Sequence, residues 1–133
     1  VTRGRFKTAL PPELSPTQFV DALNRNADFV LSQTERDALI SRLTVDNTAS
    51  ERALVLRQVA ENASLKNNEF NKAFVLMEYF GYLRRNPNEG PDTNFNGWQF
   101  WLNKLNQFNG NFVHAEMVKA FISSIEYRQR FGP

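Results

Sequence analysis

The feature that most constrains the fold is the aromatic segment over residues 71–131. Both tryptophans and all three tyrosines of the chain lie in it. Its apolar side chains recur every three or four positions over residues 73–85, 97–105 and 117–125, the period of an α-helix with one buried face. We therefore expect a long helix ending at Arg85, a polar loop over residues 86–96, a second helix, a glycine-containing turn and a last helix that frays after Glu126.

Three helix-start signals precede this segment. Ser15, Ser32 and Thr48 each stand three residues before a glutamine or glutamate, the spacing of a capping box. These signals predict helices that run to about residue 26, to residue 43 and to about residue 62, followed by a short helical turn over residues 63–70. The side chains expected on the inner faces are Phe19, Val20, Leu23, Ala38, Leu39, Leu43, Leu54, Val55, Val59 and Ala60.

The fold class follows from these patterns. Residues 1–14 contain Pro11-Pro12 and no helical period, so we expect an extended arm in which Phe6 and Leu10 can dock on the body. No stretch alternates with period two over the length of a strand. At 133 residues and 41% hydrophobic content, the chain is long enough for one sizeable core. We predict an all-α protein in which residues 15–133 form a single compact bundle of about six helices.

An internal repeat is visible when the helices are aligned. Phe19-Val20 corresponds to Phe74-Val75, and further correspondences share an offset of 62 residues. The pairs with that offset are Leu39 with Trp101, Leu43 with Leu105, Val55 with Met117, Val59 with Phe121 and Leu65 with Tyr127. Two interpretations stay open: a duplicated three-helix unit with halves at 15–70 and 71–131, or a chance alignment of two amphipathic trios.

Composition excludes several functions. The chain has no cysteine and one histidine, His114, so thiolate chemistry and sites with several histidines are excluded. Its net charge of +2 includes Arg3, Arg5 and Lys7 at the start, and the remaining body offers no basic face for nucleic acid. No apolar run approaches the length of a membrane span. Because the chain opens on Val1 within a polar segment, we expect it to be part of a longer protein.

The loop over residues 92–97 has the pattern of a calcium site. Asp92, Asn94 and Asn96 alternate before Gly97, as in the first half of an EF-hand loop, and Glu89 could contribute from the same loop. The twelfth position of such a loop is Asn103, where a bidentate glutamate is required. The alternative is that Asn94 or Asn96 caps the next helix and Gly97 relaxes its first turn.

Two aromatic groups are candidates for recognition. Trp98 and Trp101 lie three residues apart on one helix, with Trp101 expected to point inward and Trp98 to be part-exposed. An exposed patch of Trp98, Phe108 and Phe112 would mark a partner site. The alternative is that these side chains only pack between helices.

No catalytic set is recognisable. His114-Ala115-Glu116 has the spacing of a zinc-deaminase motif, but the required cysteines are absent, and Ser123-Ser124 lacks the context of a serine nucleophile. Glu126 lies on the apolar side of the last helix and needs a partner there. We predict that Arg85 provides it in a structural ion pair.

The C-terminal half resembles a known family, the bacterial "domain of unknown function 4214", which is related in pattern to phycobilisome linker domains. The residues that match its two motifs are Tyr79, Leu83, Arg85, Pro87, Gly97, Phe100, Trp101 and Leu105, then Phe121, Ser124, Glu126 and Tyr127. The chain departs from the pattern at Asn88, where the family has aspartate, and in the additional residues 89–96. We expect Arg85, Trp101, Glu126 and Tyr127 to have structural roles in this chain.

The resemblance implies a module near the end of a large secreted or cell-surface bacterial protein, without established catalysis. We therefore expect a non-catalytic interaction module that binds a protein or surface partner. The alternative is a calcium- or carbohydrate-binding module that uses the loop 86–98. A hydrolase with paired carboxylates is a third hypothesis, but no two acidic residues have a spacing that indicates it.

Overall fold

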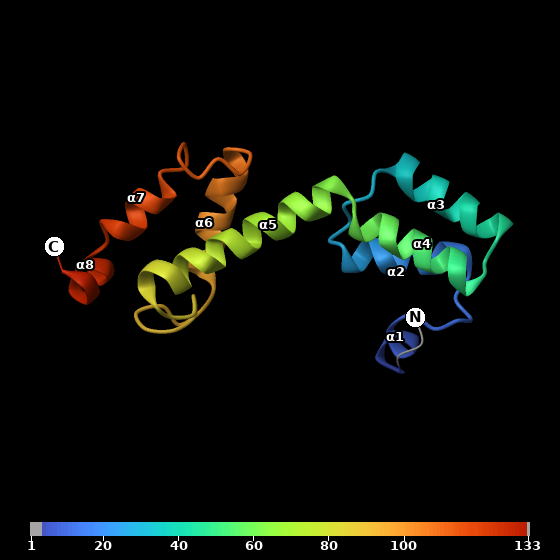
Figure 1. Ribbon diagram of the computed structural model, residues 1–133, viewed down its shortest axis with the longest axis horizontal. Coiled ribbons are helices and arrows are strands. Elements are labelled where there is room, and N and C mark those ends of the chain that lie inside the picture. Colours follow the sequence, from blue (N-terminus) through green and yellow to red (C-terminus); the bar gives the residue numbers. More distant parts are fainter. Residues whose placement is uncertain (1–3, 133) are drawn as a thin grey trace. The chain divides into compact units, whose positions relative to one another are not determined.

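The computed structural model describes residues 4–132, and every regular element in that range is helical (Figure 1). The all-α prediction is confirmed. The elements are α1 (Gly4–Ala9), α2 (Pro16–Asn26), α3 (Gln33–Val45), α4 (Ala49–Ala60), α5 (Ala63–Glu78), the π-helix η1 (Tyr79–Leu83), α6 (Asn96–Gln107), α7 (Met117–Ile122) and α8 (Ile125–Phe131). Within the described range, no helix is long and apolar enough to cross a membrane.

The chain divides into two compact units, up to residue 66 and from residue 67 onward, here called the N-terminal and C-terminal units. The boundary falls inside α5, four residues before the boundary of the expected halves 15–70 and 71–131. The buried hydrophobic side chains form two separate clusters, one in each unit.

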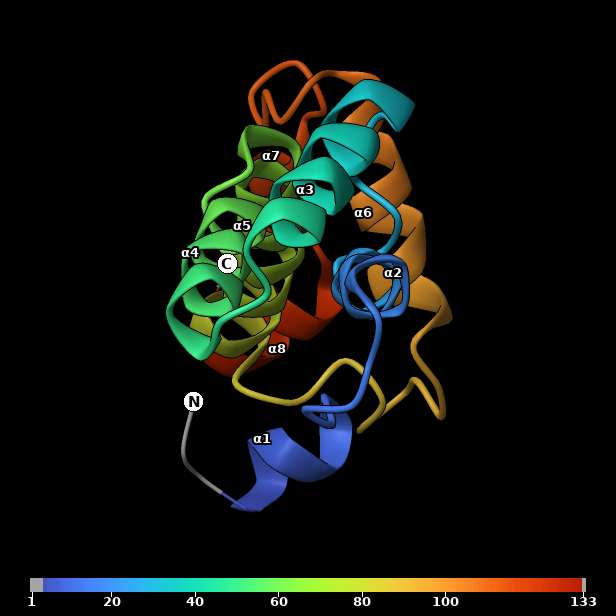
Figure 2. The ribbon, with the colours of Figure 1, turned by 90° about the vertical axis from the view of Figure 1, so that its right-hand side faces the viewer.

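In the N-terminal unit, α2, α3 and α4 pack against one another (Figure 2). Ser15 and Ser32 form the reciprocal capping boxes that the sequence predicts. Thr48 also accepts a hydrogen bond from the backbone N–H of Glu51. The prediction of a full capping box is wrong here, because the Glu51 side chain does not accept from the N–H of Thr48. The N–H of Thr48 instead donates to Asp46, and the Glu51 carboxylate pairs with Arg42.

The core of the N-terminal unit follows the predicted inner faces, with three exceptions. Ala38, Leu54 and Ala60 are exposed. Leu54 is 46% exposed because α4 turns Arg52, Val55 and Val59 inward, and an adjacent helical position points about 100° away. The buried set is Leu10, Phe19, Val20, Leu23, Ala27, Leu39, Leu43, Val55 and Val59.

The expectation of an extended N-terminal arm is wrong for residues 4–9, which form α1. Pro11 and Pro12 exclude helix only at and just before their own positions, so the segment ahead of them is free to coil. Leu10 is buried and Phe6 packs against the same core, as predicted. The first residues of the arm, Val1 to Arg3, lie outside the described residues.

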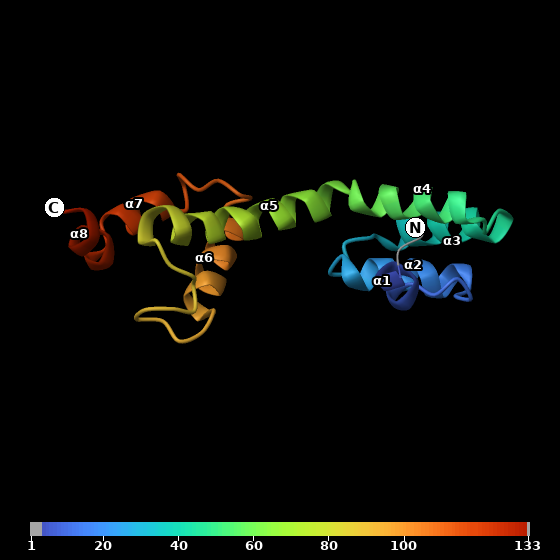
Figure 3. The same cartoon turned by 60° about the horizontal axis from the view of Figure 1, so that its bottom comes forward.

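Two further helix boundaries, one in each unit, differ from expectation. Residues 63–70 are no separate turn but the start of the continuous helix α5, which the Asn62 side chain caps by accepting from the N–H groups of Ser64 and Leu65. The predicted last helix is two helices, α7 and α8 (Figure 3). Ser124 divides them because its hydroxyl accepts from the N–H of Tyr127 and donates to the carbonyl of Phe121.

The residues after Glu126 therefore do not fray. They form the capped helix α8, which ends at Phe131 before Gly132, where φ is 91°. Pro133 lies outside the described residues. The core of the C-terminal unit consists of Val75, Tyr79, Leu83, Leu102, Leu105, Ala115, Met117 and Phe121. Trp101, expected to point inward, is only half-buried and packs on the margin of this core.

Candidate functional site

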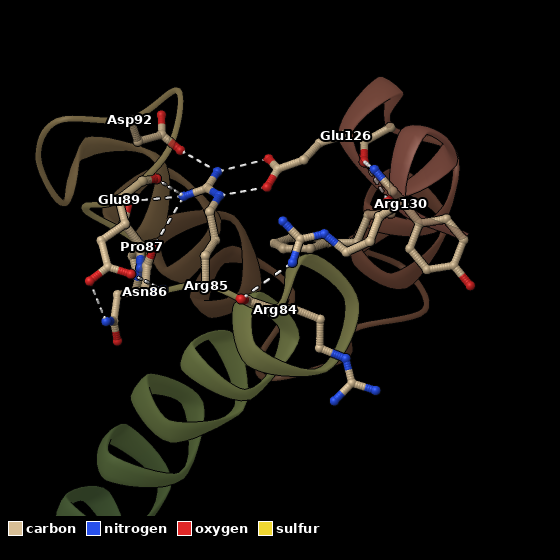
Figure 4. Close-up of polar contacts among 11 residues, drawn as sticks. Arg84, Arg85, Asn86, Pro87, Glu89, Asp92, Glu126 and Arg130 are labelled. Carbon is tan, nitrogen blue, oxygen red and sulfur yellow. Dashed lines mark hydrogen bonds and ion pairs between the residues drawn. The ribbon is translucent and has the colours of Figure 1, made fainter. Parts of the chain in front are cut away.

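The best-defined polar site of the C-terminal unit is centred on Arg85 (Figure 4). The π-helix η1 ends at Leu83, and the next residue, Arg84, has a left-handed φ of 54° that turns the chain out of the helix. Arg85 follows immediately, and its side chain is only 9% exposed. A buried guanidinium has to find acceptors for its N–H groups, and here they come from the loop and from α8.

The Arg85 guanidinium binds two carboxylates. Its Nε and Nη2 donate to the two carboxylate oxygens of Glu126 at 2.7 and 3.0 Å, and Nη2 also donates to Asp92 Oδ2 at 2.7 Å. The predicted Arg85–Glu126 pair is thus present in bidentate form. The hydrogen bond to Glu126 is the largest cause that raises the pKa of Arg85, against the opposing effect of burial. The site therefore holds a permanent cation between two acids.

Arg85 also fixes the loop that follows it. Its Nη1 donates to the carbonyl oxygens of Glu89 and Asn86 at 2.7 and 3.1 Å. Its guanidinium lies 5.2 Å from the centre of the Tyr79 ring, where a cation–π contact is favourable. Burial raises the pKa of this Tyr79 phenol, and the nearby Asp92 raises it further. Arg85 thereby connects the end of η1, the loop and α8.

Two of the three side chains that the calcium hypothesis takes as ligands have hydrogen-bond partners within the protein. Asp92 is engaged by Arg85, and the Asn94 side chain accepts from the N–H of Asn96 at 2.9 Å. Asn96 is exposed at the first position of α6. Within the described residues, no group of three or more acidic or histidine side chains could hold a metal ion.

Gly97 has a different role from the relaxed turn that the sequence predicts. It lies within α6, and a Cβ placed on it would come 2.7 Å from the Tyr79 hydroxyl. Real Cβ atoms do not approach another heavy atom so closely. Because Tyr79 is 3% exposed and held in the core, glycine at this position lets α6 begin directly against the Tyr79 phenol.

Exposed apolar side chains are concentrated in the C-terminal unit. Of the fourteen large hydrophobic side chains that are exposed among the described residues, eleven lie after residue 66. They are Phe70, Met77, Phe80, Phe95, Phe100, Phe108, Phe112, Val113, Ile122, Ile125 and Phe131. Single exposed apolar residues are normal on any protein, but so uneven a distribution over two units of nearly equal length is not.

One apolar groove lies on this unit. Ala73 and Leu76 of α5 form one wall, and Phe95 and Trp98 form the other, with Glu69 and Lys72 at its margin. The Phe95 and Trp98 rings meet edge to face with their centres 6.4 Å apart, and Phe95 is 52% exposed. The indole N–H of Trp98 is buried without a hydrogen-bond partner.

The three aromatic residues predicted to bind a partner do not line one hollow. Trp98 lines the groove with Phe95, whereas Phe112 stacks on Phe74 at 5.2 Å, and Phe74 stacks on Phe70 at 6.3 Å. Phe108 is exposed just after α6. Phe70 was missed from the sequence, although its spacing of four residues from Phe74 was a usable signal.

A buried acid is the second unpredicted feature. Glu78 is 7% exposed on the inner face of α5, between Val75 and Tyr79 in helical register. Its Oε2 atom is buried without a hydrogen-bond partner, and burial raises the pKa of the Glu78 carboxyl. His114, the lone histidine, is by contrast exposed.

Comparisons of the chain with protein-family models, with curated proteins and with solved structures found no match.

Proposed function

We propose that the C-terminal unit is a non-catalytic interaction module that binds a protein partner through its aromatic surface. The observation that carries this proposal is the concentration of eleven exposed large apolar side chains in this unit. The groove between α5 and Trp98 offers a partner an apolar hollow on the same unit. Solvent-exposed apolar surface of this kind is costly unless a partner covers it. Aromatic side chains in particular supply most of the energy of protein interfaces.

The Arg85 site supports this proposal as a brace rather than as a reaction centre. Glu126 and Asp92 both accept hydrogen bonds from the one Arg85 guanidinium, and this proposal gives both acids a structural role. The same contacts fix the loop that leads to Phe95 and Trp98. A rigid loop reduces the entropy cost of binding at the groove beside it. Together with the resemblance, this favours a module of a larger secreted or cell-surface bacterial protein.

Site-specific photo-crosslinking tests the proposal. Phe95 is replaced by p-benzoylphenylalanine in the full chain, which is irradiated in an extract of its source cells. A matched chain carries the same group at Phe29, which is 68% exposed in the N-terminal unit. We expect one discrete adduct from position 95, absent from position 29 and lost on competition with unlabelled protein. Equal labelling from both positions, or no adduct from position 95, would contradict the proposal.

If the loop 86–98 bound calcium instead, calcium should raise the melting temperature of the protein. A site with a Kd a hundredfold below the calcium concentration would stabilise the protein by about 2.7 kcal/mol. Because Asp92 is engaged by Arg85, we expect the same melting temperature in millimolar calcium and in EDTA. A calcium-dependent increase that Asp92→Ala abolishes would move the calcium-binding alternative ahead of protein binding.

A further inference from the structure

A second hollow of the C-terminal unit has a very different lining. Five asparagines, Phe70 and Gly110 surround it, and no charged side chain does. The five are Asn67, Asn68, Asn71, Asn106 and Asn109. Its volume of about 590 Å³ lies within the range of small-ligand sites. The hollow is separate from the loop 86–98 and from the groove at Trp98.

Contacts between two elements form the hollow. The Asn71 side chain of α5 donates to the Asn106 side chain of α6 at 2.9 Å. Beyond α6 the chain turns through two successive positive φ angles, 51° at Asn109 and 79° at Gly110. A Cβ on Gly110 would lie 3.1 Å from Asn71 Oδ1, so glycine admits the Asn71 amide there. Asn109 suits its left-handed position because asparagine tolerates that conformation.

Three of the five amides are available to a ligand. The side chains of Asn67, Asn68 and Asn109 are exposed and make no hydrogen bond within the described residues. Each amide offers two donors and an acceptor at fixed spacing. Neighbouring hydroxyl groups of a sugar ring both donate and accept, so they can pair with such amides two at a time. Because no charged side chain lines the hollow, an ionic ligand would form no ion pair with it.

Phe70 supplies the apolar part of the hollow. Its ring is 66% exposed, yet it is held by the stack that continues through Phe74 to Phe112. A ring fixed in this way loses little entropy when a ligand packs on it. The C–H face of a pyranose with equatorial hydroxyl groups is flat and apolar, and its edges are polar. Such a ring can lie on Phe70 while its edges reach the amides.

We propose that the hollow formed by Phe70 and the five asparagines binds a neutral saccharide of the glucose or N-acetylglucosamine type. This site shares no lining residue with the groove at Trp98, although Phe70 is also one of the eleven exposed apolar side chains. A module with both sites would bring a protein partner and a glycan surface together.

Nuclear magnetic resonance of the full chain tests this proposal directly. Cellobiose and N,N′-diacetylchitobiose are titrated into ¹⁵N-labelled protein, and the side-chain NH₂ signals of the five asparagines are followed. We expect saturable shifts of these signals with at least one disaccharide, while the side-chain NH₂ signal of the exposed Asn88 stays unchanged. No saturable shift with either disaccharide would overturn the proposal.

Matched variants separate the site from general surface effects. Phe70→Ala and Asn109→Asp should each weaken binding by about tenfold, the upper end of what one net contact contributes. Phe95→Ala, which removes an exposed ring of the other groove, should leave saccharide binding unchanged. Equal affinity of Phe70→Ala and the parent chain would also overturn the proposal. Circular dichroism of each variant confirms that it remains helical.

Discussion

The two units differ in how completely they bury their large apolar side chains. In the N-terminal unit, Ser15, Ser32 and Thr48 cap the helices, and only three large apolar side chains are exposed in its described part. The described part of the C-terminal unit contains a π-helix and eleven exposed large apolar side chains. Left-handed residues other than glycine occur in both units, at Asp28 and Phe29 in the first and at Arg84, Asn109 and Glu116 in the second. Irregular backbone and exposed apolar surface both reduce stability, and both recur where proteins bind ligands.

The buried arginines show the same contrast. Arg52 of the N-terminal unit donates to the Asn47 side chain and to the carbonyls of Leu14 and Pro11, without a carboxylate. It also lies over the Phe19 ring. Arg85 is neutralised by two carboxylates instead. The Arg52 guanidinium thus donates only to neutral oxygens and fixes the chain before α2. The Arg85 guanidinium forms an ion-pair network that fixes the loop after it.

The internal alignment makes the comparison specific. Val20 and Val75, Leu43 and Leu105, and Val55 and Met117 are all almost fully buried in their own units. A duplicated three-helix unit would produce equal burial at matched positions, and so would two amphipathic trios aligned on their apolar faces, so both interpretations stay open. When the alignment of Phe19 with Phe74 is continued by four residues, Leu23 corresponds to Glu78. A core leucine in one unit therefore corresponds to a buried acid in the other.

The largest expected effect comes from the ion-pair network. Glu126→Gln removes the charge that two nitrogens of Arg85 bind, and we expect a loss of about 2 kcal/mol in the free energy of unfolding. The matching fall in melting temperature is several degrees. Glu116→Gln is the control because its pair with Lys119 is exposed. An unchanged melting temperature of Glu126→Gln would show that the network does not stabilise the unit.

The next effect has the opposite sign. Glu78→Leu, which copies Leu23, should stabilise the protein by about 1–2 kcal/mol near neutral pH, because a buried acid without a full set of partners is costly. The control is Leu23→Glu, which should destabilise strongly. No gain for Glu78→Leu in urea unfolding would mean that its carboxyl is satisfied.

The gain from Glu78→Leu should depend on pH. Burial raises the pKa of Glu78 above its ordinary value of 4.5, so the folded protein keeps this proton to higher pH than the unfolded chain. The stability of the parent chain therefore falls as pH rises from the unfolded pKa through the folded one. Below the unfolded pKa this ionisation penalty is absent. The stability difference should widen as pH rises from the unfolded pKa through the folded one, and a constant difference would contradict this cause.

The smallest effect concerns the close approach at Gly97. Gly97→Ala forces its Cβ against the Tyr79 hydroxyl, and we expect a net loss of about 1 kcal/mol after the better helix propensity of alanine is included. Gly81→Ala has no atom within 4 Å of its new Cβ and should be neutral or slightly stabilising. Equal effects of the two substitutions would show that Tyr79 moves aside freely.

The sequence predicts much of the regular structure because local signals determine it. The caps at Ser15 and Ser32, the apolar period of α2 and the Arg85–Glu126 pair all depend on residue types that have few alternatives. The π-helix was not predictable, since no local pattern in residues 79–83 indicates it. The break at Ser124 was missed although its signal is local, because the hydroxyl caps α8 by accepting from the N–H of Tyr127. The asparagine hollow was not predictable either, since its two groups of residues, 67–71 and 106–110, lie far apart in sequence.

Amide hydrogen exchange of the free, full chain at neutral pH tests the central claim most directly. That claim is that stability is concentrated in the N-terminal unit and recognition in the C-terminal unit. We predict that the slowest amides lie in α2, α3 and α4, and that those of η1, α6 and α7 exchange through openings of lower free energy. Equal protection in both units, or stronger protection in η1 and α7, would contradict the claim.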